Sequence, residues 1–125
     1  MACDRTLVAI VDDDAGVLRA LSRLVRSLGY EPVAFHSGEA LLSSVDAQTP
    51  AFAILDQHLP GQTGLETLSM LAQWMPPIPA AIITGLDEPG LRERCLAAGA
   101  VAYILKPVSQ VDIDAAITGA TSRTG

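Results

Sequence analysis

The chain has 125 residues, of which 50% are hydrophobic and 18% are charged, so it is long enough for one domain with its own core and too apolar to be disordered. Its net charge of −6 opposes direct binding to nucleic acid, because phosphate backbones are held by Lys and Arg. No apolar run reaches the roughly 18 residues of a membrane span, and the start MACDRT is not a signal peptide. We therefore expect a soluble, cytoplasmic protein without membrane contact, in which Cys3 and Cys95 stay reduced because they match no disulfide or zinc pattern.

In chain order, short apolar runs alternate with segments of helical period. The first run, LVAIV at 7–11, is apolar throughout, which is typical of a strand covered on both faces. A helical stripe follows it, with an Asp as the cap at its start and Gly29 as its stop. The same alternation predicts further strands at 31–35, 51–55, 80–84 and 101–105, and further helices at 38–45, 64–75, 88–99 and 109–120.

Several local features refine these elements. Ser37 is expected to cap the second helix, and the fourth helix is expected to begin near Pro89. Trp74 and Met75, at the end of the third helix, are interpreted as packing residues. The last five residues, 121–125, are small and polar without periodicity, and they resemble the start of a linker or a frayed end.

Five strands alternating with five helices predict one α/β domain over 1–125. Right-handed crossovers then give a doubly wound, five-stranded parallel sheet with helices on both faces. The carboxyl ends of parallel strands share one edge, where ligands bind. The side chains that follow the strands are therefore expected to gather there: Asp12, Asp13 and Asp14, then His36 and Ser37, then Asp56, then Thr84 and Gly85, and last Lys106 and Pro107.

Carboxylates from neighbouring strands at this edge would repel one another, at a cost on the order of 3 kcal/mol for each pair. Such a cluster favours a cation, and oxygen ligands of this kind suit Mg²⁺ or Mn²⁺. Lys106, the only lysine in the chain, and the hydroxyl of Thr84 would together suit a tetrahedral dianion. Asp56, alone on its strand end, is then the candidate nucleophile for an aspartyl phosphate. A helix cap explains Asp14 equally well.

Four motifs in this order carry a family resemblance: VDDD at 11–14, ILDQHLPGQTGLE at 54–66, IITG at 82–85 and AGAVAYILKP at 98–107. With them, the chain resembles the response-regulator receiver domains of two-component signalling over about residues 5 to 120, and among these the receivers of FixJ/NarL-type transcription factors. The resemblance implies a flavodoxin-like, CheY-like sheet of strand order 2-1-3-4-5. It also implies a sensor histidine kinase as partner.

The resemblance assigns the acidic residues and the lysine as follows. Asp56 accepts a phosphoryl group from a phosphohistidine of the kinase. Asp12 and Asp13 bind Mg²⁺ together with Asp56 and the backbone carbonyl of His58. Lys106 contacts the phosphoryl group and precedes Pro107 through a cis peptide bond.

The resemblance also implies a conformational switch. Thr84 hydrogen-bonds the phosphoryl group and Tyr103 turns inward behind it. These movements remodel the face of the fourth helix, fifth strand and fifth helix, which then dimerises or releases an output domain. That output domain would be a helix-turn-helix domain absent from this chain.

Three residues are candidate modulators of the site: Asp14, Gly85 and the side chain of His58. The imidazole of His58 either tunes the access of water to the acyl phosphate or is a solvent-facing loop side chain. Asp14 either guards the metal site or caps the first helix.

Two other functions are open at this point. An aspartyl-phosphate phosphatase or phosphotransferase would carry a second acid two residues after its nucleophile, whereas Asp56 is followed by Gln57 and His58. A phosphorylation-independent interaction module would have no reason to keep the acidic set and Lys106 together. An FMN binder is weaker still, because three acids after the first strand would repel a phosphate. The expected switch catalyses only its own phosphorylation and slow dephosphorylation, so we do not expect a turnover enzyme.

Overall fold

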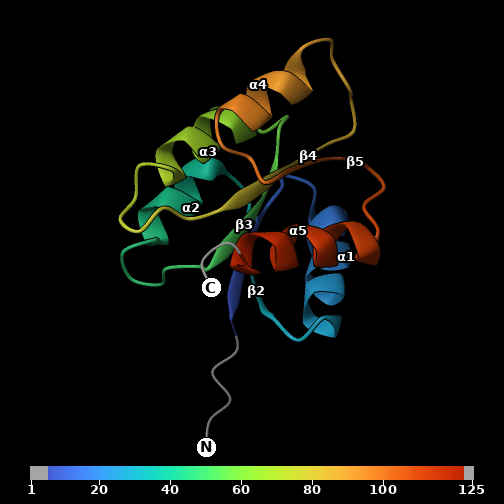
Figure 1. Ribbon diagram of the computed structural model, residues 1–125. Coiled ribbons are helices and arrows are strands. Elements are labelled where there is room, and N and C mark those ends of the chain that lie inside the picture. Colours follow the sequence, from blue (N-terminus) through green and yellow to red (C-terminus); the bar gives the residue numbers. More distant parts are fainter. Residues whose placement is uncertain (1–5, 123–125) are drawn as a thin grey trace, which may run out of the picture.

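A computed structural model describes residues 6–122, which form a five-stranded parallel sheet covered by helices on both faces (Figure 1). The strand order β2-β1-β3-β4-β5 confirms the predicted fold. In chain order the elements are β1 (Leu7–Val11), α1 (Ala15–Ser27), β2 (Glu31–Phe35), α2 (Gly38–Ser44), β3 (Phe52–Asp56), α3 (Gly64–Leu71), β4 (Ala80–Thr84), α4 (Leu91–Ala97), β5 (Ala102–Leu105) and α5 (Gln110–Ser122).

Alternation along the strands divides the interior into two cores. Val8 and Ile10 of β1 face α1 and α5, whereas Ala9 and Val11 face α2, α3 and α4. Figure 1 shows these two groups of helices on opposite sides of the sheet. Successive side chains of a strand point to opposite faces, so a strand buried on both faces must be apolar throughout. Every residue of β3 and β4, the strands that lead to the predicted site, is buried.

The predicted caps are confirmed. Asp14 Oδ1 accepts hydrogen bonds from the N–H groups of Gly16 and Val17 at 2.7 and 3.2 Å. Ser37 Oγ accepts one from the N–H of Ala40 at 3.1 Å. Gly29 has φ of +95°, the left-handed conformation that ends α1.

Helix boundaries differ from the sequence prediction where proline and glycine intervene. Helix α3 ends at Leu71 and not at Met75, because Pro76 and Pro77 follow and disfavour helical backbone before them. The interpretation of Met75 as a packing residue is wrong: its side chain is 88% exposed. Trp74 does pack against the core on the α2 to α4 side.

The two last helices are also shifted. Helix α4 begins at Leu91, two residues after Pro89, because Gly90 has φ of +79° and cannot be its first helical residue. Helix α5 continues to Ser122, so it includes the first two residues of the segment expected to be a linker or a frayed end, whereas residues 123–125 lie outside the described part of the chain, as does Cys3. Within residues 6–122, no helix combines the length and hydropathy of a membrane span.

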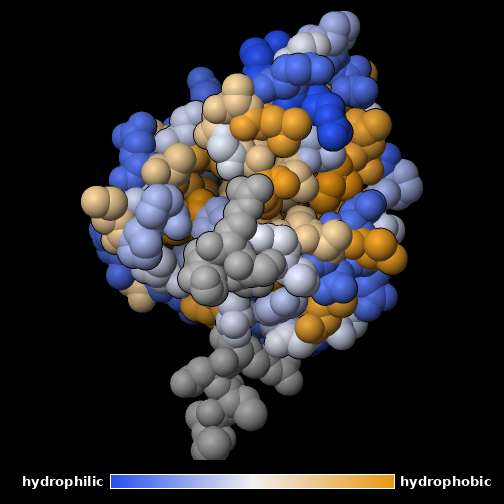
Figure 2. Space-filling model, viewed as in Figure 1, coloured by the Kyte–Doolittle hydropathy of each residue, from blue (hydrophilic) through white to orange (hydrophobic). Residues whose placement is uncertain are grey.

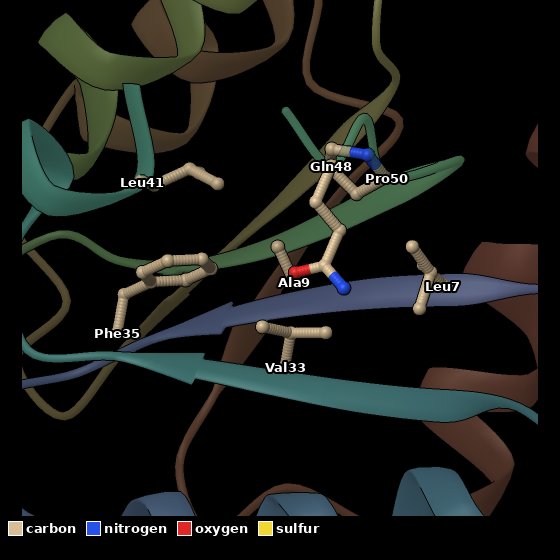
Figure 3. Close-up of a pocket in the computed structure, with 7 residues that line it drawn as sticks. All are labelled: Leu7, Ala9, Val33, Phe35, Leu41, Gln48 and Pro50. Carbon is tan, nitrogen blue, oxygen red and sulfur yellow. The ribbon is translucent and has the colours of Figure 1, made fainter. Parts of the chain in front are cut away.

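The segment that follows the short helix α2 covers part of β1 and β2 on one face of the sheet (Figure 3). Gln48 and Pro50 lie over Ala9 and Val33, beside Leu41 (Figure 3). The space between these side chains does not admit even a water molecule.

Gly64, the first residue of α3, is fixed by a close approach of backbones. A Cβ atom on Gly64 would lie 2.5 Å from the carbonyl oxygen of Asp56, whereas a Cβ on Gly119 in α5 would meet no atom within 4 Å. We predict that Gly64→Ala lowers the free energy of unfolding by about 2 kcal/mol, because α3 must move away from β3. Gly119→Ala should raise it by about 0.5–1 kcal/mol, as for alanine in an open helix. Urea unfolding of both variants checks this pair, and equal effects would contradict it.

Candidate functional site

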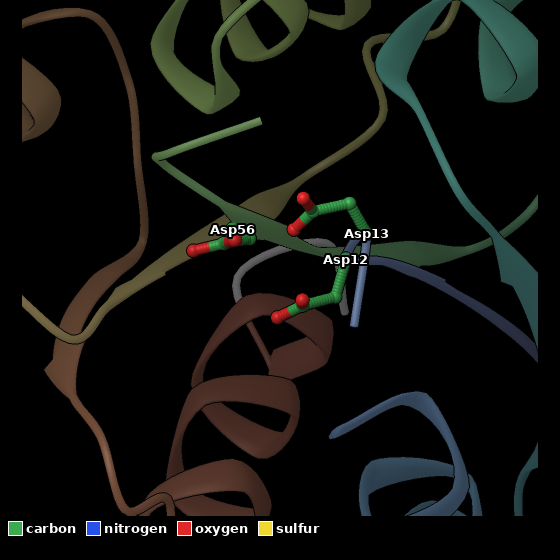
Figure 4. A group of neighbouring side chains, drawn as sticks. All are labelled: Asp12, Asp13 and Asp56. Atoms are coloured by element: carbon green, nitrogen blue, oxygen red, sulfur yellow. The ribbon is translucent and has the colours of Figure 1, made fainter. Parts of the chain in front are cut away.

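Three carboxylates meet at the carboxyl ends of β1 and β3. Asp12 and Asp13 directly follow β1, and Asp56 is the last residue of β3. Each offers one oxygen, and these three oxygens lie within 4.8 Å of one another (Figure 4). Asp12 and Asp56 are 1% and 4% exposed, whereas Asp13 faces solvent. The cluster predicted from the strand ends is therefore present.

Lys106 brings a positive charge into this cluster from the end of β5. Its Nζ lies 2.9 Å from Asp12 Oδ2 and 3.5 Å from Asp56 Oδ1, and these are the only salt bridges among residues 6–122. The peptide bond from Lys106 to Pro107 is cis, as the family resemblance implied. The other oxygen of Asp12 accepts a hydrogen bond from the N–H of Asp14 at 2.9 Å, so Asp12 is held on both sides.

The electrostatics of the cluster favour a further cation. Burial raises the pKa of Asp56, and the charge of Asp12 raises it further, although Lys106 opposes both. Burial lowers the pKa of Lys106, but its hydrogen bond to Asp12 and the charges of Asp56 and Asp12 outweigh burial and leave that pKa raised. Three carboxylates and one ammonium carry a formal charge of −2, and the donors are all oxygens. This set fits a hard divalent cation.

Hydrogen bonds hold the loop of residues 57–63 at several points. The Gln57 side chain, 8% exposed, accepts a hydrogen bond from the N–H of Leu65 at 2.9 Å. Glu39 of α2 accepts one from the N–H of Gln62 at 3.1 Å. The sequence analysis missed both roles: Gln57 belongs to the motif at 54–66, but its side-chain partner could not be read from that motif, and Glu39 belongs to no motif. The Thr63 and Glu66 capping box of α3 was readable as T-x-x-E in the sequence.

Two hydroxyl groups, one on β4 and one on β5, bind the segment after β4. Thr84 is fully buried, donates a hydrogen bond to the carbonyl of Leu86 at 3.0 Å and accepts one from its N–H at 3.1 Å. Tyr103 is 9% exposed, lies in the core and donates to Asp87 Oδ1 at 2.8 Å. Burial and the hydrogen bond to Asp87 raise the pKa of Tyr103 to about 12. Asp87 is a further partner that the sequence did not reveal.

The remaining predicted residues are not members of the acidic group. Asp14 caps α1, and its carboxylate is not a member of the three-residue acidic group. The side chains of His36 and His58 are exposed. Gly85 adjoins Lys106, because a Cβ atom there would lie 3.9 Å from Lys106 Cδ. An open hollow of about 540 Å³, lined in part by Asp13, His58 and Glu88, leads from solvent to the site.

Comparison with known families decides what this arrangement is. Residues 8–118 match the family model described as the response regulator receiver domain. The chain belongs to this family. Its members are receiver domains of response regulators, and the fold of this chain is that of a CheY-like receiver domain.

Named relatives agree with the assignment. The receiver domain is 34% identical over 122 residues to nodulation protein W of Bradyrhizobium diazoefficiens, covering 98% of this chain and 54% of that protein. It is 36% identical over 112 residues to the response regulator protein TmoT of Ectopseudomonas mendocina, covering 90% and 51%. A CheY-like receiver domain protein from Methanospirillum hungatei superposes with a TM-score of 0.85 at 26% identity, covering 96% of this chain and 99% of that one. The chain spans about half the length of the curated relatives it matches.

We predict that Asp56→Asn stabilises the metal-free receiver at neutral pH. Because the folded-state pKa of Asp56 is raised, its ionised form costs stability above that pKa, and the cost is absent below the unfolded pKa of about 3.9. The variant should gain about 1 kcal/mol at neutral pH, and the gain should shrink toward about pH 4. Urea unfolding in EDTA measures it, with Asp46→Asn at an exposed position as control. A less stable Asp56→Asn protein at neutral pH would refute the conclusion that ionised Asp56 destabilises the fold.

Proposed function

We propose that this receiver domain is a phosphorylation-dependent switch in which Asp56 accepts a phosphoryl group from a phosphohistidine of a sensor histidine kinase. One observation carries the proposal: a buried carboxylate at a strand end lies 3.5 Å from the only lysine of the chain, inside an acidic group open to solvent on one side. A buried carboxylate whose pKa is raised by burial and a neighbouring acid is more basic than a solvated one, which favours it as a nucleophile.

The transfer requires little covalent machinery from the protein. A carboxylate oxygen of Asp56 forms a bond to phosphorus while the bond from phosphorus to the histidine nitrogen breaks, and the electron pair leaves with the imidazole. Lys106 Nζ, already between Asp12 and Asp56, neutralises charge on the phosphoryl oxygens. Asp12, Asp13, Asp56 and the backbone carbonyl of His58 would hold Mg²⁺ or Mn²⁺, which supplies further neutralisation of those oxygens. The hollow beside Asp13 and His58 gives the donor access.

Thr84 connects phosphorylation to the rest of the domain in this proposal. Its hydroxyl carries one proton, which it now donates to the carbonyl of Leu86. Donation to a phosphoryl oxygen requires Thr84 to leave that carbonyl, which releases the segment after β4. Tyr103, bonded to Asp87 in the same segment, then repacks with it. Asp14, Gly85 and the side chain of His58 stay candidate modulators of this step.

The face of α4, β5 and α5 is the proposed output surface. It exposes three large apolar side chains, Leu96, Leu105 and Val111, which are 41%, 48% and 76% exposed. Figure 2 shows hydrophobic surface on the right-hand flank, where β5 lies in Figure 1. Exposed apolar patches of this kind favour a protein partner, and we propose a second copy of the receiver.

The proposal extends to the whole regulator. We infer a single receiver domain over 1–125 of a cytoplasmic FixJ/NarL-type transcription regulator, whose helix-turn-helix output domain would bind DNA while the receiver itself does not. The order of the four sequence motifs and the half-length match to the curated relatives support this proposal.

Intact-mass spectrometry after incubation with acetyl phosphate and Mg²⁺ tests the phosphorylation. We predict a gain of one phosphoryl group that is lost in Asp56→Asn and in EDTA. Lys106→Met should slow the gain by about tenfold or more, since the phosphoryl charge is then unmatched. No gain in the wild type with either acetyl phosphate or a phosphorylated kinase would favour a phosphorylation-independent interaction module.

Light scattering tests the output surface. We predict that phosphorylation promotes a dimer and that Leu96→Asp weakens the dimer by about tenfold, because the charge must be desolvated in an apolar contact. Met70→Asp is the matched control, since Met70 is 44% exposed on α3, outside the proposed surface. Both variants should accept the phosphoryl group like the wild type. Equal loss of dimer in both would place the interface elsewhere.

A further inference from the structure

We propose that Gln57 is a positioning residue that holds the peptide carbonyl of His58 toward the acidic cluster and thereby sets the affinity of the site for a divalent cation. This inference rests on the proposed metal-dependent function. The acidic cluster supplies charge, but a carbonyl ligand on a loop must be held in place by the loop itself. The contacts of Gln57 show how this loop achieves it.

Gln57 is anchored to two elements by three hydrogen bonds. Its backbone N–H donates to the carbonyl of Ile83 in β4 at 2.9 Å. Its backbone carbonyl accepts from the N–H of Gly64 at 3.3 Å, and its side-chain Oε1 accepts from the N–H of Leu65 at 2.9 Å. The first residue of the loop is thus bound to the first turn of α3, where the loop ends. The side chain is 8% exposed, which limits its freedom to move.

His58 lies between two held residues. Its side chain is exposed, and its N–H lies 3.5 Å from Asp56 Oδ1. On one side Gln57 is bound to β4 and α3, and on the other side Leu59 is 6% exposed in the core against α2, α3 and α4. The backbone at His58 is therefore flanked on both sides by residues that are held in place.

This arrangement requires a side chain with an acceptor oxygen at position 57. An apolar side chain could fill the same buried place, but the N–H of Leu65 would then lack its acceptor. The first turn of α3 has three such N–H groups: those of Gly64 and Leu65 are bound by Gln57, and that of Glu66 is bound by Thr63 Oγ1 at 3.1 Å. Gln57 and Thr63 therefore cap the same turn, but only Gln57 is also the residue directly before His58.

This division supplies a matched pair of variants, Gln57→Leu and Thr63→Ala. Each removes one acceptor from the same helical turn. Isothermal titration of Mg²⁺ and of Mn²⁺ into the apo receiver, without any phosphoryl donor, measures the affinity, and thermal unfolding in EDTA measures stability. We expect both variants to lower the unfolding temperature. Gln57→Leu should weaken cation binding by about tenfold, the effect typical of groups that orient a metal ligand, while Thr63→Ala stays within about twofold of the wild type.

A third variant keeps the test decisive if Gln57→Leu does not fold. Gln57→Glu retains an acceptor oxygen for Leu65 and adds a charge that attracts cations, so it should bind at least as tightly as the wild type. Weaker binding by Gln57→Glu, wild-type binding by Gln57→Leu, or an equal loss in Thr63→Ala would each overturn the positioning role. Absence of cation binding by the wild type would instead refute the proposed metal-dependent function.

Discussion

One ammonium group makes the site possible. Lys106 Nζ lies between Asp12 and Asp56, which are almost fully buried and close enough to repel each other by on the order of 3 kcal/mol. Each attraction to Lys106 is at least as large at the same effective dielectric, since these distances are shorter. The attraction does not remove the strain, because the pKa of Asp56 stays raised by burial. The site therefore holds its carboxylates in a state that added positive charge relieves.

The rest of the fold serves this placement. In a parallel sheet the carboxyl ends of all strands meet at one edge, so apolar runs followed by Asp12, Asp56, Thr84 and Lys106 were sufficient to predict both the fold and the cluster from the sequence. The periodicity that identified the helices said less about their ends. Met75 was misplaced because the prolines that follow override the apolar pattern of α3.

The hydrogen-bond partners around the cluster could not be predicted. Tyr103 is hydrogen-bonded to Asp87, which is 16 residues away in the sequence, and Gln62 to Glu39, which is 23 residues away. Only the tertiary structure fixes how the elements that carry these residues are placed. An exposed acid such as Asp87 carries no periodic signal, since such residues also occur on any solvated surface. Sequence alone therefore indicates which groups reach the sheet edge, but not which of them already have hydrogen-bond partners.

In the proposed switch, the existing hydrogen bonds of Thr84 and Tyr103 are the contacts that phosphorylation would change. Thr84 and Tyr103 each have a single hydroxyl proton, and both protons are donated to the segment that follows β4, to Leu86 and to Asp87. In the proposed switch, a phosphoryl group on Asp56 would compete with Leu86 for the proton of Thr84, so the segment could not keep all its contacts while the site gains one. A ligand shifts a conformational equilibrium only through such a difference in contacts between two states. The coupling proposed between the acidic cluster and the face of α4, β5 and α5 would thus follow from the single hydroxyl proton that each of two buried side chains can donate.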